Sequence, residues 1–393
     1  MNFERLGQQL NQQRTNDLYR VRTAVNGGNQ RQLTSGEKSF LNFSSNDYLG
    51  LACDEQVKLG AIDAVNKYGA GCGGSPLVTG HSRLAKYLED LIKDLTGQSG
   101  VMLYTSGFAA NSGVISSLLT KDDYLVQDKL NHASLMNAGS DSAVKMQRFA
   151  HNDMASLAKQ LQSKTSINAS DRLVVTEGVF SMDGDGAPLA EISQLCRNHH
   201  AWLMVDDAHG FGINGGGAGS CAQANITPDI LMATFGKAIG TSGAFVAADK
   251  EVIDYLVNFC RHYIYSTSLS PMIIGATMTS IELAQQPCRH QKLAELIGYF
   301  RDRASQLGLA IMPSSSAIQP LIIGDSHRAI AIANRLKEQG IWLTAIRPPT
   351  VAVGSARLRI TLSTNHQESD IDRLLTALAE AVNDTQSSDY NDR

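Results

Sequence analysis

The chain has 393 residues, a formal net charge of −4 and a hydrophobic fraction of 43%. This length allows two domains with a large core, and the weak acidity excludes a general electrostatic surface for nucleic acid or an anionic membrane. No apolar run approaches the roughly 20 residues that span a bilayer, and the polar N-terminal segment does not look like a secretory signal. Six cysteines are scattered without a C-x-x-C pair. We therefore expect a cytoplasmic protein with reduced thiols, no bound metal, and no nucleic-acid or membrane partner.

From residue 100 onward, short apolar segments alternate with amphipathic ones, which is the pattern of βαβ units. The apolar segments predict strands at 100–107, 123–128, 145–149, 172–180 and 201–209. The segments between them predict helices at 108–119, 132–140, 154–164 and 188–200. The fold class predicted is therefore α/β, with a mostly parallel sheet flanked by helices and joined by right-handed crossovers.

The pattern changes after residue 250, where the chain becomes mainly helical to about residue 309. A second α/β pattern follows, with strands at 318–324, 341–346 and 356–363 and helices at 327–340 and 370–383. We predict an N-terminal helix and arm over 1–45, a large domain over 46–283, and a small C-terminal α/β domain over 284–393.

One lysine lies between two apolar runs in the stretch ILMATFGKAIGTSGAFVAA, which extends from Ile230 to Ala248. Lysine is rarely buried unless it is paired. Lys237 is therefore either a structural residue with an exposed amine or a residue whose amine takes part in chemistry. Gly240 and Gly243 would let the backbone of this turn pass close to its surroundings.

Ligands of open parallel sheets bind beyond the carboxyl ends of the strands, and several polar residues follow strands in this sequence. Asp206 follows one strand and could pair with a buried cation. A metal site made by Asp206 and His209 has weak support, because no third ligand is evident nearby. His132 follows another strand, although a single histidine usually has a structural role. Ser181 follows a third strand and could face the same site.

A glycine-containing turn, Ser106-Gly107-Phe108, lies between a predicted strand and a predicted helix. The free N–H groups and positive dipole of a helix start favour an anion such as phosphate. The same residues could also make an ordinary tight turn. Neither this turn nor the one at Lys237 matches the G-x-x-x-x-G-K-[ST] pattern of a nucleotide-binding loop.

A lysine, a strand-end aspartate, an anion-binding helix start and a histidine at one sheet edge together suit pyridoxal phosphate. The lysine would hold the cofactor aldehyde as a Schiff base, and burial would favour its neutral amine by lowering its pKa. The aspartate would keep the pyridine nitrogen protonated, and the helix start would hold the phosphate. On this hypothesis Lys237 is displayed on a rigid turn so that its nitrogen reaches a cofactor.

Five motifs resemble those of the α-oxoamine synthases, which are fold-type-I pyridoxal-phosphate enzymes. They are SGFAANSG, VVTEGVFSMDGD, VDDAHG (205–210), TFGKAIGTSGA (234–244) and YSTSLSP, and the resemblance runs from about Arg14 to near Asp372. It implies a large domain that binds pyridoxal 5'-phosphate, a small C-terminal domain, and a homodimer with shared active sites. It also implies the joining of an amino acid to an acyl thioester with release of carbon dioxide.

Two segments, NFSSNDYLGL (42–51) and AIRPPTV (345–351), are most similar to family members that use L-alanine and pimeloyl-CoA or pimeloyl-acyl carrier protein. The nearest alternative is another α-oxoamine synthase that uses glycine or serine with a different acyl-CoA. A transaminase of the same fold is a further alternative. A subunit without catalytic activity would be expected to lack the lysine, and Lys237 is present.

The resemblance also implies roles for single residues. Lys237 is matched to the Schiff-base lysine and general base, Asp206 to the partner of the pyridine nitrogen, and His132 to the residue that stacks on the ring and serves as a second acid. His209 and Ser181 are matched to positions near the phenolic oxygen. The remaining matches are cofactor and phosphate contacts at Gly107, Phe108 and Thr234. Substrate contacts are matched at Arg20, Asn46, Arg347 and Thr350, and also at His132.

Among the arginines, we favour Arg347 over Arg357 and Arg359 as the anchor of the amino-acid carboxylate. The two prolines after Arg347 restrict the local backbone. Three departures from the family pattern, at Cys72, Pro76 and Phe211, leave the shape of the acyl pocket open.

Overall fold

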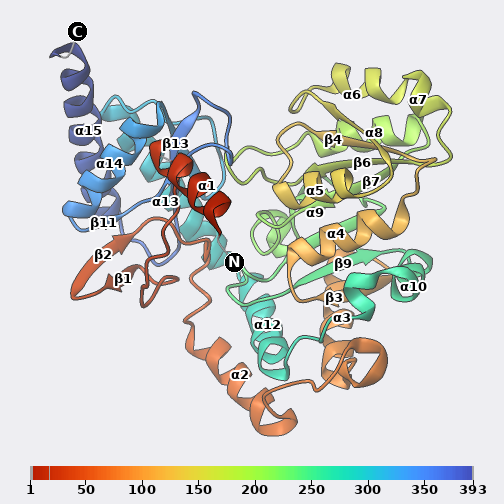
Figure 1. Cartoon of the computed structure of the whole chain (residues 1–393). Coiled ribbons are helices and arrows are strands. Elements are labelled where there is room, and N and C mark those ends of the chain that lie inside the picture. The colour runs from red at the N-terminus through yellow and green to blue at the C-terminus, as the bar shows by residue number, and fades with distance from the viewer. Residues whose placement is uncertain (1–2, 17, 392–393) are drawn as a thin grey trace. The chain divides into compact units, whose positions relative to one another are not determined.

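The computed structural model describes residues 3–16 and 18–391 (Figure 1). Its contacts divide the chain into two compact units. The smaller unit comprises Met1–Tyr48, Met182–Gly184 and Gln291–Arg393, and the larger unit comprises Leu49–Ser181 and Asp185–His290. None of the helices in the described ranges is long and apolar enough to cross a bilayer.

The larger unit is built on a seven-stranded sheet with the order β3-β9-β8-β7-β6-β4-β5. The strands are β3 (Gly100–Tyr104), β4 (Tyr124–Asp128), β5 (Lys145–Phe149), β6 (Arg172–Glu177), β7 (Trp202–Asp206), β8 (Ile230–Thr234) and β9 (Ala244–Ala248). β9 is antiparallel to both neighbours, and the other neighbouring pairs are parallel. The predicted α/β class with a mostly parallel sheet is therefore confirmed.

Helices flank this sheet, and α4 and α5 lie side by side (Figure 1). The helical segments of the larger unit are α2 (Glu55–Tyr68), η1 (Pro76–Gly80), α3 (Arg83–Thr96), α4 (Gly107–Leu118), α5 (Ala133–Asp141), α6 (Met154–Leu161), α7 (Lys164–Ile167), α8 (Leu189–Asn198), η2 (Asn214–Gly217), α9 (Ser220–Gln223), α10 (Lys250–Phe259), α11 (Arg261–Ile264) and α12 (Pro271–Ala284). Val114 of α4, Leu135 of α5 and Leu256 of α10 join Met232 and Val246 of the sheet in one buried core. Burial of these side chains stabilises the sheet by about 1.5–3 kcal/mol for each large aliphatic residue.

The starts of α4 and α5 are fixed by side-chain caps. The Ser106 hydroxyl accepts a hydrogen bond from the Ala109 N–H, and the His132 ring accepts one from the Ser134 N–H. Such caps satisfy N–H groups that have no partner inside the helix. They also place both helix starts directly after the carboxyl ends of β3 and β4.

The smaller unit contains two three-stranded sheets with the orders β1-β2-β11 and β10-β13-β12. Its elements are α1 (Glu4–Thr15), β1 (Gln32–Ser35), β2 (Lys38–Asn42), β10 (Ile318–Gly324), α14 (Ser326–Glu338), β11 (Ile341–Trp342), β12 (Ala345–Ile346), β13 (Ala356–Thr361), α15 (Glu368–Asn391) and most of α13 (Pro287–Gln306). The single strand predicted at 341–346 is wrong, because β11 pairs with β2 and β12 pairs with β13 in a different sheet.

Candidate active site

A cavity of about 180 Å³ lies in the larger unit beside the carboxyl ends of β6, β7 and β8. The sequence-predicted residues that line it are Gly107, Phe108, His132, Asp206, Thr234 and Lys237. Asn111, Ser134, Glu177, Ala208 and Met232 complete the lining. Parallel strands and the helix starts that follow them thus bring residues more than 100 positions apart in the sequence to one place.

Asp206 is the last residue of β7, and its carboxylate is buried in this cavity. Its Oδ1 accepts a hydrogen bond from the Ala208 N–H at 3.0 Å, and its Oδ2 accepts one from Asn111 Nδ2 at 2.8 Å. A carboxylate has about four acceptor positions, so acceptor capacity remains. The group can therefore receive a further N–H donor from a bound ring.

Lys237 lies on the turn between β8 and β9, and its side chain is half-buried. The Gly240 N–H donates to the Lys237 carbonyl at 2.8 Å, which closes the turn. Gly240 has a φ of +69°, and a Cβ there would lie 2.5 Å from the backbone nitrogen of Ala52. Any other residue at this position would be strained and would displace the backbone. The glycine therefore fixes the position from which Lys237 reaches the cavity.

The start of α4 lines part of the cavity. Gly107 and Phe108 are its first two residues, and the first N–H groups of a helix have no partner within the helix. These N–H groups form the positive end of the helix dipole. An anion such as phosphate is stabilised beside them. Thr234 lies nearby on β8, where its hydroxyl donates to the Gly243 carbonyl at 2.8 Å.

His132 is held by its backbone and by its ring. Its N–H donates to Glu177 Oε1 at 2.6 Å, and its Nδ1 lies 2.8 Å from the Ser134 hydroxyl. Burial lowers the pKa of His132. The negative charge of Asp206 opposes this effect, and the positive charge of Lys237 adds to it.

Glu177 was not singled out from the sequence, although it lies at the end of β6 and pairs in register with Asp206. It is buried, and burial together with the negative charge of Asp206 raises the pKa of Glu177 well above its usual range. The available signal was its position: a carboxylate at the end of an apolar strand, as at Asp206. Asn111 and Ser134 lie inside helical patterns, where nothing local marks them.

Ser181 and His209 are buried in the larger unit but are not among the residues that line the cavity. Ser181 lies four positions after the last residue of β6, and His209 lies three positions after Asp206. Within the described part of the chain, no group of three or more His, Cys, Asp or Glu side chains is arranged to hold a metal ion.

The predicted substrate residues Arg20, Asn46, Arg347 and Thr350 belong to the smaller unit. Arg20 Nη2 donates to Thr350 Oγ1 at 3.3 Å, so these two residues contact each other across 330 sequence positions. Arg347 is half-buried in the same unit. Their contact with a substrate stays a prediction.

The other two arginines considered as carboxylate anchors are engaged within the smaller unit. Arg357 pairs with Asp183 at 2.5 Å, and both side chains are nearly buried. Arg359 donates to Asn46 Oδ1 at 3.0 Å and to the Tyr48 hydroxyl at 3.3 Å.

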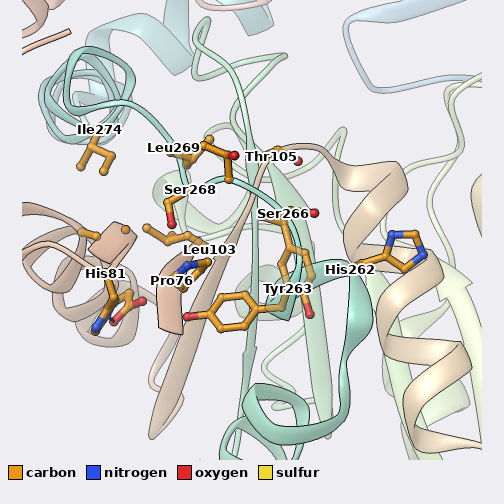
Figure 2. Close-up of a pocket in the computed structure, with 15 residues that line it drawn as sticks. Pro76, His81, Leu103, Thr105, His262, Tyr263, Ser266, Ser268, Leu269 and Ile274 are labelled. Carbon is orange, nitrogen blue, oxygen red and sulfur yellow. Dashed lines mark hydrogen bonds and ion pairs between the residues drawn. The ribbon is translucent and has the colours of Figure 1, made fainter. Parts of the chain in front are cut away.

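A second cavity in the larger unit is lined by residues of the YSTSLSP motif and by η1 and α3 (Figure 2). Figure 2 shows the Tyr263 ring among the labelled side chains, while His262 points away from them. At about 20 Å³ this cavity has room for about one water molecule, so it is too small for a cofactor.

Two of the departures from the family pattern have structural partners. Cys72 Sγ lies 3.1 Å from the Ser268 carbonyl and 3.4 Å from the Gly74 carbonyl. Phe211 is buried, and its ring packs edge-on against Phe245 with centroids 4.9 Å apart. Phe211 therefore fills the core of the larger unit rather than the cavity.

A sequence model of the family described as aminotransferase class I and II matches residues 38–378. The chain is 48% identical over 378 residues to an 8-amino-7-oxononanoate synthase of Photobacterium profundum, covering 95% of this chain and 96% of the relative. It is 45% identical over 379 residues to a protein of the same name from Salmonella paratyphi C, covering 95% of this chain and 98% of the relative.

Solved structures give the same result. An 8-amino-7-oxononanoate synthase of Francisella tularensis has a TM-score of 0.77 at 26% identity and covers 88% of this chain and 99% of its own. A serine palmitoyltransferase variant of S. paucimobilis with a bound PLP–myriocin aldimine has a TM-score of 0.88 at 25% identity and covers 96% of this chain and 97% of its own. The predictions of fold type and of a pyridoxal-phosphate cofactor are confirmed. This chain therefore belongs to the aminotransferase class I and II family of pyridoxal-phosphate enzymes and, within it, to the 8-amino-7-oxononanoate synthase group of acyltransferases.

Proposed function

We propose that this enzyme condenses L-alanine with a pimeloyl thioester to give 8-amino-7-oxononanoate, carbon dioxide and the free thiol, a step in the synthesis of biotin. The observation that carries the proposal is the cavity that gathers Lys237, Asp206, His132 and the start of α4. Relatives named for this product, 45–48% identical over 95% of the chain, support the choice of substrates.

The donor set of the cavity fits pyridoxal 5'-phosphate. Asp206 has spare acceptor capacity for a ring N–H, and the first N–H groups of α4 suit a phosphate. Lys237 supplies an amine for the aldehyde. When bound, the cofactor supplies an electron sink that stabilises negative charge on the substrate Cα.

Three residues of the cavity would move or stabilise charge during the reaction. Lys237 would hold the aldehyde carbon of the cofactor and, once released as a free amine, would remove the Cα proton of alanine as a general base. Asp206 would stay ionised and keep a proton on the ring nitrogen, since a carboxylate stabilises a nearby positive charge. His132 would stack on the ring and donate a hydrogen bond to a substrate oxygen.

The remaining residues would position the ligands. Gly107, Phe108 and Thr234 would bind the phosphate end of the cofactor, and His209 and Ser181 would bind its phenolic oxygen. Arg347 would bind the alanine carboxylate, because a guanidinium can make two parallel hydrogen bonds to it. The acyl-substrate contacts proposed are Arg20, Asn46 and Thr350.

We infer a cytoplasmic homodimer with shared active sites. Large apolar side chains on α2 and η1 support this inference, because Leu59, Ile62, Leu77 and Val78 are each more than half exposed. Burying such side chains against another protein surface would be favourable. The GAGCGGS loop (69–75) and the YSTSLSP motif are the segments proposed to contribute to the neighbouring site.

The alternative reaction joins serine or glycine to a different acyl-CoA. The structural match to serine palmitoyltransferase, with a TM-score of 0.88, is the observation in its favour. Sequence identity weighs against it, because the structurally similar serine palmitoyltransferases are 25–28% identical to the chain and the 8-amino-7-oxononanoate synthases reach 48%. Alanine is therefore the preferred amino acid.

The proposal is tested by following the visible absorbance of the cofactor-loaded enzyme during titration with L-alanine, glycine and L-serine in turn. The cofactor band should respond at the lowest concentration to alanine, and adding pimeloyl-CoA should then produce a second spectral change. A stronger response to glycine or serine would move the assignment to another α-oxoamine synthase with a different amino-acid substrate. The absence of a visible cofactor band would contradict the role of Lys237.

A further inference from the structure

A chain of hydrogen bonds links Asp206 to His132 through two buried side chains that line the cavity. Asn111 Nδ2 lies 2.8 Å from Asp206 Oδ2 and 2.9 Å from Ser134 Oγ. Ser134 Oγ lies 2.8 Å from His132 Nδ1. Asn111 and Ser134 are each 1% exposed, so bulk water does not compete for these bonds.

The chemistry of each group fixes the direction of these bonds. A carboxylate only accepts and an amide nitrogen only donates, so Asn111 donates one proton to Asp206 and the other to Ser134. The hydroxyl of Ser134 has one proton of its own. Since its oxygen already accepts from Asn111, that proton is available for His132 Nδ1.

A second donor faces the same ring nitrogen. The backbone N–H of Ser134 points to His132 Nδ1 at 3.2 Å, as the cap of α5. A backbone N–H cannot accept a hydrogen bond, so a proton on Nδ1 would face a donor. The arrangement therefore favours an unprotonated Nδ1, which in a neutral histidine leaves the proton on Nε2.

The charged groups around His132 act on its protonation in different directions. Glu177 on β6 accepts the His132 backbone N–H at 2.6 Å and fixes the residue rather than the ring nitrogens. Asp206 on β7 raises the pKa of His132, whereas Lys237 beyond β8 lowers it. Burial is the largest influence and also lowers the pKa, which agrees with a neutral ring.

We propose that Asn111 and Ser134 are positioning residues that hold His132 as the neutral tautomer protonated at Nε2. In that state His132 can act on a substrate oxygen only as a hydrogen-bond donor through Nε2, and it cannot take up a proton through Nδ1. The tautomer is a property of this chain alone. Its use in the condensation rests on the function proposed above.

The direct test is nitrogen-15 NMR of the full chain labelled at histidine, recorded without and with pyridoxal phosphate. The His132 signals are assigned by their loss in His132→Gln. At neutral pH the two ring nitrogens should show the separate shifts of an unprotonated Nδ1 and a protonated Nε2. A protonated Nδ1 in the wild-type chain would overturn the proposal.

Variants of Ser134 distinguish its proposed effect on the His132 tautomer from a general structural role. Ser134→Ala should raise the pH midpoint of His132 by roughly half to one pH unit, because one hydrogen bond to the unprotonated nitrogen is lost. Ser134→Thr keeps the hydroxyl and should keep the wild-type midpoint. Ser142→Ala, at the other end of α5, is the matched control for loss of a serine hydroxyl. An unchanged midpoint in folded Ser134→Ala would contradict the proposal.

Asn111→Ala tests the next residue in the chain of hydrogen bonds between His132 and Asp206. It removes the donor that orients the Ser134 hydroxyl, so the His132 midpoint should again rise while the backbone of α5 stays intact. In the cofactor-loaded enzyme, the acidic limb of the kcat/KM profile should move to higher pH with the same variants. The enzyme could show the expected NMR result and yet fail to turn over alanine and a pimeloyl thioester. That outcome would overturn the proposed function and would support the proposed His132 tautomer.

Discussion

At the scale of single residues, the position of Lys237 depends on backbone that only glycine can form. Gly240 combines a left-handed φ with a close approach to Ala52, so a larger residue there would disturb the turn. The lysine amine consequently starts from a fixed point beside the cavity. A fixed starting point matters because a reacting group misplaced by about 1 Å can lose about 100-fold in rate.

Replacing Lys237 by alanine should lower turnover by at least about 1,000-fold, because the variant lacks both the amine for the cofactor and the general base. Product formation and the visible cofactor band are the measurements. Lys250→Ala is the matched control, since Lys250 is an exposed lysine of the same unit paired with Asp254. Normal product formation by the purified Lys237 variant would refute the assignment.

The candidate site was predictable from sequence only where a residue with a reactive or charged side chain follows the end of a strand. Asp206, His132 and Lys237 have such positions, and they line one cavity. Asn111 and Ser134 could not be found in this way, because polar residues within helical patterns are common. Their importance comes from α4 and α5 lying side by side, which no local pattern states.

At the scale of elements, the charged side chain of His151 connects the end of β4 to the segment that follows β6. His151 Nδ1 lies 3.0 Å from Asp128 at the end of β4, and Nε2 lies 2.8 Å from Asp185. Burial lowers the pKa of His151, but the hydrogen bonds to the two carboxylates outweigh burial and raise it to about 10. The ring also packs edge-on against Phe180.

His151→Gln should lower the free energy of unfolding by about 1–3 kcal/mol at pH 6. The folded pKa lies above the unfolded value of 6.5, so the stabilisation is complete below pH 6.5 and is lost as pH rises through about 10. Urea unfolding at several pH values measures the difference, which should shrink toward pH 10. His327→Gln, at an exposed histidine, should show no such trend. A difference that grows with pH would contradict this account.

Two packed helices of the larger unit, α2 and α12, meet through glycines. A Cβ at Gly275 would lie 2.5 Å from the Gly60 carbonyl oxygen and 2.6 Å from the Ala64 side chain. Gly275→Ala should therefore destabilise the protein by about 1–3 kcal/mol in thermal or urea unfolding. Gly298→Ala on α13 meets nothing within 4 Å and should be neutral or slightly stabilising. Equal effects of the two substitutions would show that helix contact is not the cause.

Element types were predictable where periodicity was strong. The strands and helices predicted between residues 100 and 209 correspond to β3 to β7 and to α4, α5, α6 and α8, but β3, β6 and β7 each end three residues earlier than predicted and α7 was not predicted. The hairpin of β1 and β2 was missed, although Gly36 at its turn has the positive φ that such turns require. The sequence pattern predicts one strand at 341–346, because a short apolar pattern does not indicate which sheet each residue joins.

At the scale of the whole molecule, the main boundaries between the two compact units follow Tyr48 and His290. The smaller unit combines an N-terminal and a C-terminal segment of the chain. The sequence patterns place boundaries after 45 and 283, and that division into domains stays a prediction. Local sequence patterns do not indicate the two units, because the smaller unit joins segments more than 200 residues apart.

The homodimer proposal is tested by Val78→Asp. Val78 lies on η1 and is 77% exposed, so a charge there should weaken an apolar interface without disturbing the core. The dimer Kd should rise by at least about tenfold, with the mass moving toward the 42.3 kDa of one chain in light scattering. Val353→Asp is the control, because Val353 is 92% exposed in the smaller unit. An unchanged dimer in the Val78 variant would exclude this surface.

The most direct test of the central claim is product analysis by mass spectrometry with the purified, cofactor-loaded enzyme. L-alanine, glycine and L-serine would each be supplied with pimeloyl-CoA and, separately, with pimeloyl-acyl carrier protein. We expect 8-amino-7-oxononanoate and carbon dioxide in equal amounts from alanine with at least one of the two thioesters. Formation of a condensation product only from glycine or serine, or transfer of the amino group without carbon dioxide, would contradict the proposed function.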